Sequence, residues 1–515
     1  MQQLKITAVL TIGMCLVYLL IYSTVSYTTL FRRPSILAAQ ISRHHNKTRG
    51  DIIVSVQKNK DSSVIQPGSK HSRQEANIIN RNKTTPNKRN TERIKQMLKR
   101  VPYNAPEILI KSQERRFDAS VGEDALGSTF PPRKPYKGDF QQVDVRIFIY
   151  SAIYQIANSS VRALILVPEP FKPVSFFCIL KRSTSHLGHR IKGQFQHIPP
   201  SRWGVYKNRC GFVHCPVPPN SYPEFISVLT ARMSSPLNVL AVNYPGPPYN
   251  RLTRCYPAVH GNFTDVNTLV TALETSRYFG TDKFLFYNYS IPEDINKVLL
   301  HYEREGIVEM RNWKLPFPPD QIHYWGQMAS IHDCVFSQLG VAKYVLLADI
   351  DEIIVPKKNV SIADLADRLL NTRKPTSQQN VYGALMFQNA FFILYENETK
   401  YMFSEKKDAK KFKMNAFLHT NRSRLNPPNY RSKLLVKPEA VNLIHVHLME
   451  EFLPGWEMYV VSPEVALMHH YREGKDNQSL NPWSQDFTFI KYSSSLIPKI
   501  KDRLISLQSE LGIQI

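Results

Sequence analysis

Strand-like and helix-like segments alternate between Arg254 and Ala348, and this order restricts the fold more than any other feature of the chain. Runs rich in aromatic and β-branched residues predict strands, and amphipathic runs between them predict helices that end near Gly280 and Gly306. Strands that alternate with helices favour a mainly parallel sheet with helices on both faces. We therefore expect an α/β domain in this part of the chain.

The expected strands of this domain cover residues 255–259, 283–290, 307–310 and 343–348, and the expected helices cover residues 266–279, 295–305 and 324–338. Further along, residues 443–447 predict a strand with His445 and His447 on one face, because side chains in a strand alternate with a period of two. Residues 496–511 predict a helix that packs on the domain.

The strand at residues 343–348 is apolar throughout its last four residues and runs directly into Asp349, Asp351 and Glu352. In an extended chain Asp349 and Asp351 project to the same side. Ligands of open α/β sheets bind at the carboxyl ends of the strands, and two carboxylates there suit a divalent cation that also binds a diphosphate. From these residues alone, an ordinary acidic turn is the alternative.

A β-rich segment precedes this domain. Four runs at residues 145–150, 161–167, 174–180 and 225–229 are separated by Pro, Gly and Asn, with no long helical pattern between them. We expect a small antiparallel module over residues 141–248, which either binds carbohydrate or braces the next domain. Cys178, Cys210 and Cys215 are possible staples within it, whereas Cys255 and Cys334 lie beyond it. These five cysteines are an odd number, so at least one is free or pairs elsewhere.

The N-terminal part predicts a membrane anchor and a stem. Residues 6–25 are uncharged and mostly apolar, about the 20 residues that span a bilayer as a helix, and no Ala-x-Ala-like cleavage site follows. Between Arg32 and Arg100, 17 Lys or Arg residues face 4 Asp or Glu residues, and no aromatic residue lies between Phe31 and Tyr103. We expect a cytosolic tail at 1–5, an anchor at 6–27 and a flexible stem at 28–140. A nucleic-acid partner is not expected, because stacking aromatics are missing from the basic segment.

Acceptor sequences for N-glycosylation suggest the compartment. Nine Asn-x-Ser/Thr triplets follow the apolar segment and none precedes it; they begin at Asn46, Asn82, Asn158, Asn262, Asn288, Asn359, Asn397, Asn421 and Asn477. This distribution predicts a single-pass type II membrane protein whose body lies in the lumen of the secretory pathway, where its cysteines are disulfide candidates.

Five short pieces of the chain resemble glycosyltransferase family 92. They are FLFYNYS at 284–290, GQ at 326–327, HDC at 332–334, ADIDEIIVP at 348–356 and HHYR at 469–472. The resemblance covers roughly residues 252–472 and implies a GT-A catalytic domain at 249–480, followed by a packing helix in 481–515. It also implies a Golgi β-1,4-galactosyltransferase that uses Mn²⁺ and transfers galactose from UDP-galactose, with inversion, to a glycan acceptor such as the fucose of an N-glycan core.

The resemblance assigns the metal site as follows. Asp349 and Asp351 form the Asp-x-Asp motif, in which Asp351 ligates Mn²⁺ and Asp349 contacts the ribose or shares the metal. A late histidine, either His447 or His470, supplies a third ligand. Glu352 either touches the donor sugar or supports the turn.

The resemblance also assigns the donor pocket. Asn288 and Ser290 lie where such folds hold the base and ribose, although many GT-A proteins have Asp in place of Asn288. Gln327 and Asp333 support the donor pocket, and the alternative for Asp333 is a role in bracing its helix. Either Lys433 or Arg472 lies against the diphosphate, with a surface ion pair as the alternative.

Inversion requires a carboxylate base that deprotonates the acceptor hydroxyl. The sequence does not single one out among Glu398, Glu405, Asp408, Glu450 and Glu451. Two other functions stay open: transfer from another UDP-sugar with the same fold, and a catalytically silent, membrane-tethered protein that binds glycans. Trp456 and Trp483 are either sugar-stacking or core residues.

Overall fold

The structure is a computed structural model that describes residue 131 and residues 138–172, 174–183, 188–199, 204–246, 249–261, 263–373, 380–394, 398–473 and 484–515. The chain divides into two units, Met1–Arg116 and Phe117–Ile515, and every described element belongs to the second. The predicted tail, the predicted anchor, most of the predicted stem and Trp483 lie outside the described residues. Within the described ranges, no helix has both the length and the apolar character of a membrane span.

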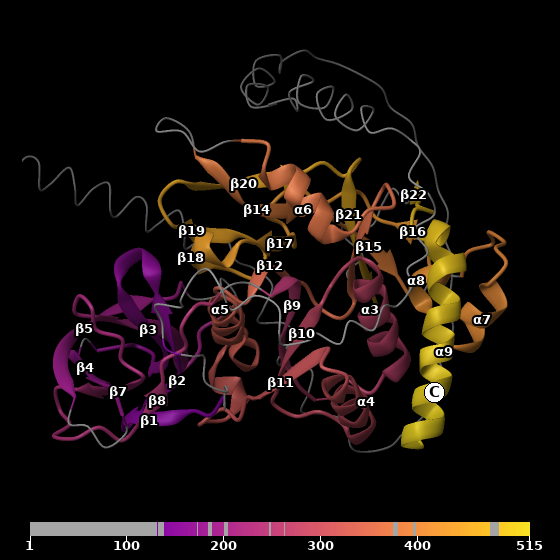
Figure 1. The fold of residues 1–515 in the computed structure, drawn as a ribbon. Coiled ribbons are helices and arrows are strands. Elements are labelled where there is room, and N and C mark those ends of the chain that lie inside the picture. The colour runs from indigo at the N-terminus through magenta and orange to yellow at the C-terminus, as the bar shows by residue number, and fades with distance from the viewer. Residues whose placement is uncertain are drawn as a thin grey trace, which may run out of the picture. The chain divides into compact units, whose positions relative to one another are not determined.

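The first eight strands form one antiparallel sheet with the order β1-β2-β3-β6-β5-β4-β7-β8 (Figure 1). Their bounds are β1 Gln141–Asp144, β2 Ile147–Gln155, β3 Ser160–Pro168, β4 Phe176–Lys181, β5 His189–His197, β6 Asn208–Pro216, β7 Phe225–Thr230 and β8 Leu240–Ala241, with a 3-10 turn η2 at Ile156–Asn158. A disulfide between Cys178 and Cys215 joins β4 to β6, and Cys210 is buried and free. We call this sheet the β module.

A seven-stranded central sheet follows, with the order β11-β10-β9-β12-β17-β14-β20. Its bounds are β9 Asn250–Val259, β10 Lys283–Asn288, β11 Val308–Asn312, β12 Ala342–Leu347, β14 Val381–Phe387, β17 Lys433–Val436 and β20 Trp456–Val461. Strands β11, β10, β9 and β12 are mutually parallel, β17 is antiparallel to both β12 and β14, and β14 is parallel to β20.

The α/β class is therefore confirmed, whereas a mainly parallel architecture describes only part of the chain. Strands β9, β10, β11 and β12 are parallel because a helix connects each to the next, namely α3 (Val266–Tyr278), α4 (Glu293–Arg304) and α5 (Gln327–Ser337), and carries the chain back to the starting edge. The parallel pair β14–β20 is not connected by one such helix, since further strands lie between its two members in the chain. Over all described strands, antiparallel pairings outnumber parallel ones, since the β module and most of the later strands meet antiparallel neighbours.

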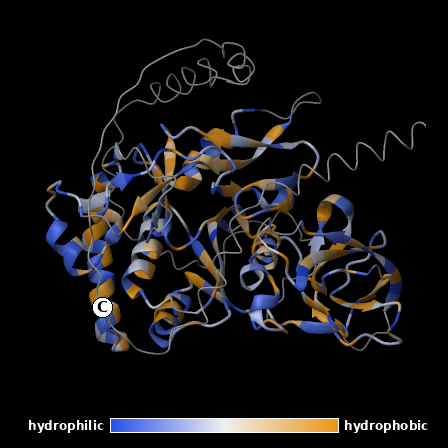
Figure 2. Cartoon of the chain, turned by 180° about the vertical axis from the view of Figure 1, so that it is seen from behind, coloured by the Kyte–Doolittle hydropathy of each residue, from blue (hydrophilic) through white to orange (hydrophobic). Residues whose placement is uncertain are grey.

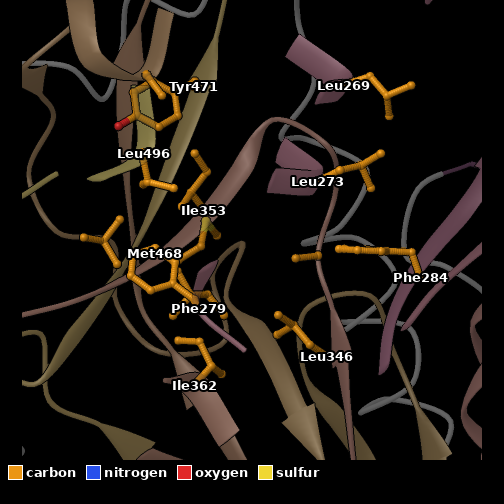
Figure 3. Close-up of a cluster of buried hydrophobic side chains, with 14 of the residues drawn as sticks. Leu269, Leu273, Phe279, Phe284, Leu346, Ile353, Ile362, Met468, Tyr471 and Leu496 are labelled. Carbon is orange, nitrogen blue, oxygen red and sulfur yellow. The ribbon is translucent and has the colours of Figure 1, made fainter. Parts of the chain in front are cut away.

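Helices cover both faces of the central sheet. Their bounds are α3 Val266–Tyr278, α4 Glu293–Arg304, α5 Gln327–Ser337, α6 Ile362–Leu370, α7 Lys406–Lys411, α8 Asn415–Leu418 and α9 Ser493–Leu511, with 3-10 turns η3 Pro319–Gln321, η4 His323–Gly326, η5 Pro438–Ala440 and η6 Ile490–Tyr492. Phe284 and Phe286 of β10 pack with α3, α4 and α9 on one face, and part of this core is shown in Figure 3. Leu285 and Tyr287 pack with α5 on the other face.

Helix α5 lies between the central sheet and the β module (Figure 1). Tyr150, Leu164 and Phe212 of the module share a buried cluster with α5, and Arg162 of β3 donates to the Asn442 carbonyl at 3.0 Å. Figure 2 shows hydrophobic and hydrophilic residues interspersed along the helices and strands, whereas all eleven residues of α5 are buried, as expected for a helix enclosed between two sheets. These contacts match the bracing role for the module.

The later strands form a five-stranded sheet with the order β13-β21-β15-β16-β22 and a two-stranded hairpin β18-β19. Their bounds are β13 Glu352–Pro356, β15 Asn389–Ile393, β16 Asn421–Arg422, β18 Val441–Ile444, β19 Met449–Phe452, β21 Ala466–Arg472 and β22 Ser484–Gln485. Strand β13 follows β12 after a short turn and pairs with β21, which places Glu352 opposite His470.

Two expected elements are wrong at their ends. The helix expected from Tyr324 begins at Gln327, because Tyr324 and Trp325 have left-handed backbone angles with φ of 44° and 53° and cannot continue a right-handed helix. The strand expected over 443–447 ends at Ile444, so His445 and His447 lie in the turn between β18 and β19. These two histidines therefore do not share a strand face.

Candidate active site

The three acids after β12 lie in a tight turn. The strand ends at Leu347, and the Glu352 amide donates to the Asp349 carbonyl at 3.2 Å, which closes the turn. The Glu352 carboxylate in return accepts from the Asp349 amide at 2.7 Å. The extended geometry expected for Asp349 and Asp351 is therefore wrong, because the chain reverses direction between them.

Arg254 of β9 holds this acidic turn through the backbone carbonyls of the turn. Its guanidinium donates to the carbonyls of Asp349 and Glu352 at 2.6 and 2.8 Å, and it also donates to the Ser276 hydroxyl of α3. Glu352 is almost completely buried, and its contacts match the turn-supporting alternative. Its role toward a donor sugar stays a prediction.

Lys433 supplies the main positive charge of the site. Its Nζ lies 2.8 Å from Asp349 Oδ2 and 3.1 Å from Glu352 Oε2, and the lysine side chain is almost completely buried. Burial raises the pKa of Asp349, but the charge and hydrogen bond of Lys433 outweigh it and the pKa is lowered. Burial raises the pKa of Glu352 despite Lys433. Lys433 thus forms buried ion pairs with Asp349 and Glu352, and it is not a surface cation.

Asp351 has a different partner. His470 Nε2 lies 3.2 Å from Asp351 Oδ2, and its Nδ1 lies 3.4 Å from Glu352 Oε1. Burial lowers the pKa of His470, but the hydrogen bond to Asp351 and the charge of Glu352 reverse that effect and raise it. The Asp351 side chain keeps 43% of its surface exposed, against 1% for Glu352. Asp351 is therefore the acid of this turn that most readily meets a ligand.

Polar and aromatic groups flank the acids at the carboxyl edge of the parallel strands. Asn288 ends β10 beside Asn312 and Val259, and the Ser290 amide donates to the Val259 carbonyl. His260 follows β9 and stacks on Trp325, with ring centres 3.3 Å apart. The predicted donor residues Asn288 and Ser290 thus lie at the edge where β12 leads into the acidic turn.

Tyr324 is an exposed ring near the acids that sequence reasoning missed. Its side chain is 51% exposed, and its ring packs edge-on against His260. Burial of the hydroxyl region and the charges of Asp349 and Asp351 raise the pKa of Tyr324. No local sequence pattern predicts the left-handed backbone of Tyr324; the one nearby signal for an unusual turn is Gly326, which also has a positive φ.

The two other predicted donor residues lie inside the protein. Gln327 is the first residue of α5 and is buried. Asp333 is fully buried and accepts hydrogen bonds from Tyr287 at 2.6 Å and from Arg311 at 2.7 Å. These contacts match the helix-bracing alternative for Asp333, because they tie α5 to β10 and β11. Because the Asp333 side chain has no exposed surface, it does not contact a donor directly and acts on the pocket only by positioning its neighbours.

The two predicted late histidines are placed differently. His470 contacts Asp351 directly. His447 lies in the turn between β18 and β19, and its Nδ1 is 3.2 Å from the Ser432 carbonyl just before β17. Burial and the charge of Lys433 lower the pKa of His447 to about 3, so its ring is neutral and suited to bind a cation. Within the described residues, no group of three His, Cys, Asp or Glu side chains converges as a metal cage.

Arg472 and Arg431 both pack on the ring of Phe391 in β15, which also contacts His470 of the site. The Phe391 ring centre is 5.3 Å from the His470 ring, 5.2 Å from the Arg472 guanidinium and 6.0 Å from that of Arg431. Arg431 has a left-handed backbone with φ of 51°, and its charge contributes to the low pKa of His447. Sequence reasoning named Arg472 but missed Arg431, which no local pattern marks.

The candidate bases are not brought together with the acidic turn by any described contact. Glu398 pairs with Lys410, Asp408 pairs with Lys501, and Glu405 accepts from the Ser493 hydroxyl. Glu450 and Glu451 are exposed on β19. None of these contacts singles out a base for an acceptor hydroxyl.

The family model of Glycosyltransferase family 92 matches residues 250–506, which is about half of the chain. The chain belongs to glycosyltransferase family 92. The match begins at the first residue of β9 and ends within α9, so it contains the central sheet, the acidic turn, Lys433 and His470.

Two relatives from Caenorhabditis elegans give the scale of this similarity. "Beta-1,4-galactosyltransferase galt-1" is 31% identical over 108 residues, which are 21% of this chain and 25% of that protein. "Glycosyltransferase family 92 protein ZK381.2" is 24% identical over 215 residues, which are 39% of each chain. The chain thus matches between a quarter and two fifths of the length of these two relatives.

Among solved structures, glucosyl-3-phosphoglycerate synthase from Mycobacterium tuberculosis, in complex with Mn²⁺, UDP and glucosyl-3-phosphoglycerate, is similar at 9% identity with a TM-score of 0.21. The alignment covers 52% of this chain and 82% of that chain. A similarity of that size does not establish a shared fold, and the assignment to family 92 does not depend on it.

Proposed function

We propose that this protein is a metal-dependent GT-A-type glycosyltransferase that transfers galactose from UDP-galactose to a glycan acceptor in β-1,4 linkage, with inversion. The observation that carries the proposal is the acidic turn Asp349–Glu352 at the carboxyl edge of four parallel strands, compensated by Lys433 and His470. The choice of galactose is supported by the similarity to the protein named "Beta-1,4-galactosyltransferase galt-1". A fucose of an N-glycan core is the proposed acceptor.

The residues present fit a divalent cation such as Mn²⁺. Cations that bind nucleotides use one or two carboxylates together with substrate phosphates, and a full protein cage is not needed. Asp351 offers a half-exposed carboxylate and Asp349 a partly exposed one, with neutral His447 and the ring of His470 nearby. When bound, the cation supplies Lewis-acid stabilisation of the charge on the departing UDP.

The chain's own groups perform the positioning. Lys433 keeps Asp349 ionised, and Glu352 together with Arg254 holds the turn in one conformation. In this proposal Asn288 and Ser290 contact the base and ribose of the donor, supported by their position at the carboxyl edge of the parallel strands, where Tyr324 also has an exposed ring. Because these groups are placed before the donor arrives, little reorganisation is needed when charge develops.

The proposed setting is the Golgi membrane, with a single-pass anchor and the body in the lumen. The apolar residues 6–25 and the nine glycosylation triplets support it, together with the disulfides Cys178–Cys215 and Cys255–Cys334. Disulfides persist in oxidising compartments, which include this lumen.

The test measures UDP release by the full chain offered UDP-galactose and a fucosylated N-glycan core, with Mn²⁺ or with EDTA. We expect turnover with Mn²⁺, none with EDTA, and a loss of roughly 100-fold or more in kcat/KM for Asp351→Asn. The control Asp502→Asn changes an exposed acid on α9 and keeps full activity. If the protein turned over UDP-glucose or UDP-N-acetylglucosamine but not UDP-galactose, the proposed donor would be wrong and that UDP-sugar would take its place. Failure to bind UDP or Mn²⁺ would favour a silent glycan-binding protein.

A further inference from the structure

Arg162 of β3 is a buried cation that joins the β module to the β18–β19 hairpin (Figure 1). It is 3% exposed, and its Nη1 and Nη2 donate to the backbone carbonyl and to the side-chain Oδ1 of Asn442 in β18, at 3.0 and 2.6 Å. Paired hydrogen bonds from one guanidinium fix the orientation of the partner as well as its distance. Arg162 lies outside residues 250–506, which the family model matches, whereas Asn442 lies inside that range.

Two aromatic rings hold the guanidinium of Arg162 in place. Its central carbon lies 4.9 Å from the ring centre of Phe212 in β6 and 4.6 Å from that of Phe336 in α5. Aromatic rings attract a cation at these distances, and more strongly where water is excluded. Burial lowers the pKa of Arg162 to about 10, and the charge of Glu451 in β19 opposes this shift, so the guanidinium stays charged at neutral pH. Arg162 is therefore a charged donor in a fixed position.

The hairpin that Arg162 contacts leads to His447, one of the two late histidines that are predicted to bind the metal. Asn442 lies in β18, and His447 lies in the turn that follows this strand. His332 of α5 accepts from the Ile444 amide at 3.2 Å. Strand β18 is therefore held at two points before the turn begins, by the β module at Asn442 and by α5 at Ile444.

The turn brings His447 close to the acidic turn. Its Nδ1 lies 3.2 Å from the carbonyl of Ser432, which directly precedes Lys433, the partner of Asp349. Besides burial, the charges of Lys433 and Asp349 act on the pKa of His447, the first lowering it and the second raising it. The hydrogen bond described for the His447 ring is to the backbone and not to an acid, so the position of the ring depends on that of the hairpin.

We propose that Arg162 is a positioning residue, which orients the β18–β19 hairpin so that His447 reaches the cation at the acidic turn. The β module is then part of the framework of the metal site, in addition to bracing the central sheet. The inference rests on the proposed function, because the cation belongs to that proposal. Groups that orient a metal-binding histidine commonly change metal affinity about 10- to 100-fold when they are removed.

The experiment measures the affinity of the full chain for Mn²⁺ by calorimetry, with UDP present. Arg162→Met keeps an apolar side chain between the two rings and removes the hydrogen bonds to Asn442, so we expect the affinity for Mn²⁺ to fall about 10-fold. The matched control is Asn238→Ala. Asn238 is 3% exposed, and its described hydrogen bonds stay within the β module, to the backbone of Val228 and Gln142. Both variants should lower the thermal midpoint, but only Arg162→Met should weaken Mn²⁺ binding.

A second comparison tests whether Arg162 acts through His447. His447→Ala by itself should weaken Mn²⁺ binding, and Arg162→Met should add no further loss in that background, because two groups that act through one contact are not additive. In UDP release from UDP-galactose, Arg162→Met should raise the Mn²⁺ concentration for half-maximal rate about 10-fold and leave kcat at saturating Mn²⁺ close to wild type. Asn442→Ala removes one of the two acceptors, should give a smaller shift in the same direction, and serves if Arg162→Met does not fold.

Equal affinity for Mn²⁺ in wild type and Arg162→Met would overturn the positioning role while the proposed function stands. Equal weakening by Asn238→Ala would also overturn it, since the effect would then reflect general loss of structure in the β module. Additive losses in the double variant, or an unchanged affinity in His447→Ala, would exclude the route through His447 and overturn it as well. Failure of the wild type to bind Mn²⁺ or UDP would overturn both proposals.

Discussion

Lys433 shows how one residue determines the charge of the whole site. Its ammonium group is buried against Asp349 and Glu352, so three charged groups share one poorly solvated volume. Removing one partner of a buried ion pair leaves the others uncompensated, which costs more than the pair itself contributes. The energetic importance of Lys433 therefore lies in the charges it neutralises.

Lys433→Met keeps the length of the side chain and removes the charge. We expect the free energy of unfolding to fall by about 3–5 kcal/mol in urea denaturation, because the Asp349 and Glu352 carboxylates lose their shared cation. The control Lys343→Met removes a half-exposed lysine that pairs with Asp367, and a surface pair of this kind contributes about 0–1 kcal/mol. Similar losses in both variants would contradict the charge network described for Lys433.

At the level of residues, the sequence predicted groups that are marked by their neighbours. Asp349 and Asp351 follow an apolar run, and that local contrast identifies them. Lys433 was noticed only as a cation near a diphosphate, because its partner Asp349 is 84 residues away and nothing local signals the pairing. Arg431 and Tyr324 were missed for the same reason: their positions depend on backbone conformations that polar patterns do not encode.

At the level of elements, the start of α5 controls the wall of the site. Gly326 has φ of +78°, and a Cβ at this position would lie 3.3 Å from the Trp313 ring. The turn η4 before it places Tyr324 and Trp325 beside His260. Both the backbone conformation and the close approach of Trp313 favour glycine here.

Gly326→Ala should destabilise the protein by about 1–2 kcal/mol for the left-handed backbone, and by more if Trp313 must shift. Gly306→Ala is the matched control, since Gly306 has φ of +75° and an added Cβ there would meet no atom within 4 Å among the described residues. Chemical denaturation of the two variants separates backbone strain from contact with Trp313. Equal destabilisation would show that the Trp313 contact contributes nothing.

The elements themselves were predicted best where one face is clearly apolar. The parallel strands and α3, α4 and α9 were expected within a few residues of their bounds. Strand β5 was missed because Gly193 is its only fully buried residue, so it lacks the alternation that marks a half-buried strand. The order of β17 and β14 in the central sheet depends on long-range pairing, which no local pattern contains.

At the level of the whole molecule, His332 connects the β module, α5 and the β18 strand. Its Nδ1 donates to the Met328 carbonyl at 2.7 Å, and its Nε2 accepts from the Ile444 amide at 3.2 Å. The ring also packs against Phe212 of the module. Burial lowers the pKa of His332 to about 3, and the neutral ring is the form that these hydrogen bonds require.

This histidine predicts a pH dependence of stability. Between pH 6.5 and 3 the unfolded chain binds a proton at this position and the folded chain does not, so stability falls as the pH is lowered through 6.5. Below pH 6.5 the contribution approaches about 1.4 kcal/mol per pH unit. Urea denaturation at several pH values between 7 and 5 gives the free energy of unfolding as a function of pH, and its slope should be smaller by this amount in His332→Gln than in the wild type. The exposed His189→Gln should keep the wild-type slope, and an unchanged slope in His332→Gln would contradict the assignment.

The reversed direction of β17 has a consequence for synthesis on the ribosome. Because β17 runs against β12, its first residue, Lys433, lies at the edge where the parallel strands end, opposite the acids. The acids emerge first, and their cation follows 84 residues later, with His470 later still. A chain that ends between β12 and β17 therefore contains the acids and Arg254 but lacks Lys433 and His470, so the charged side-chain partners of Asp349, Asp351 and Glu352 are complete only once β21 has been made.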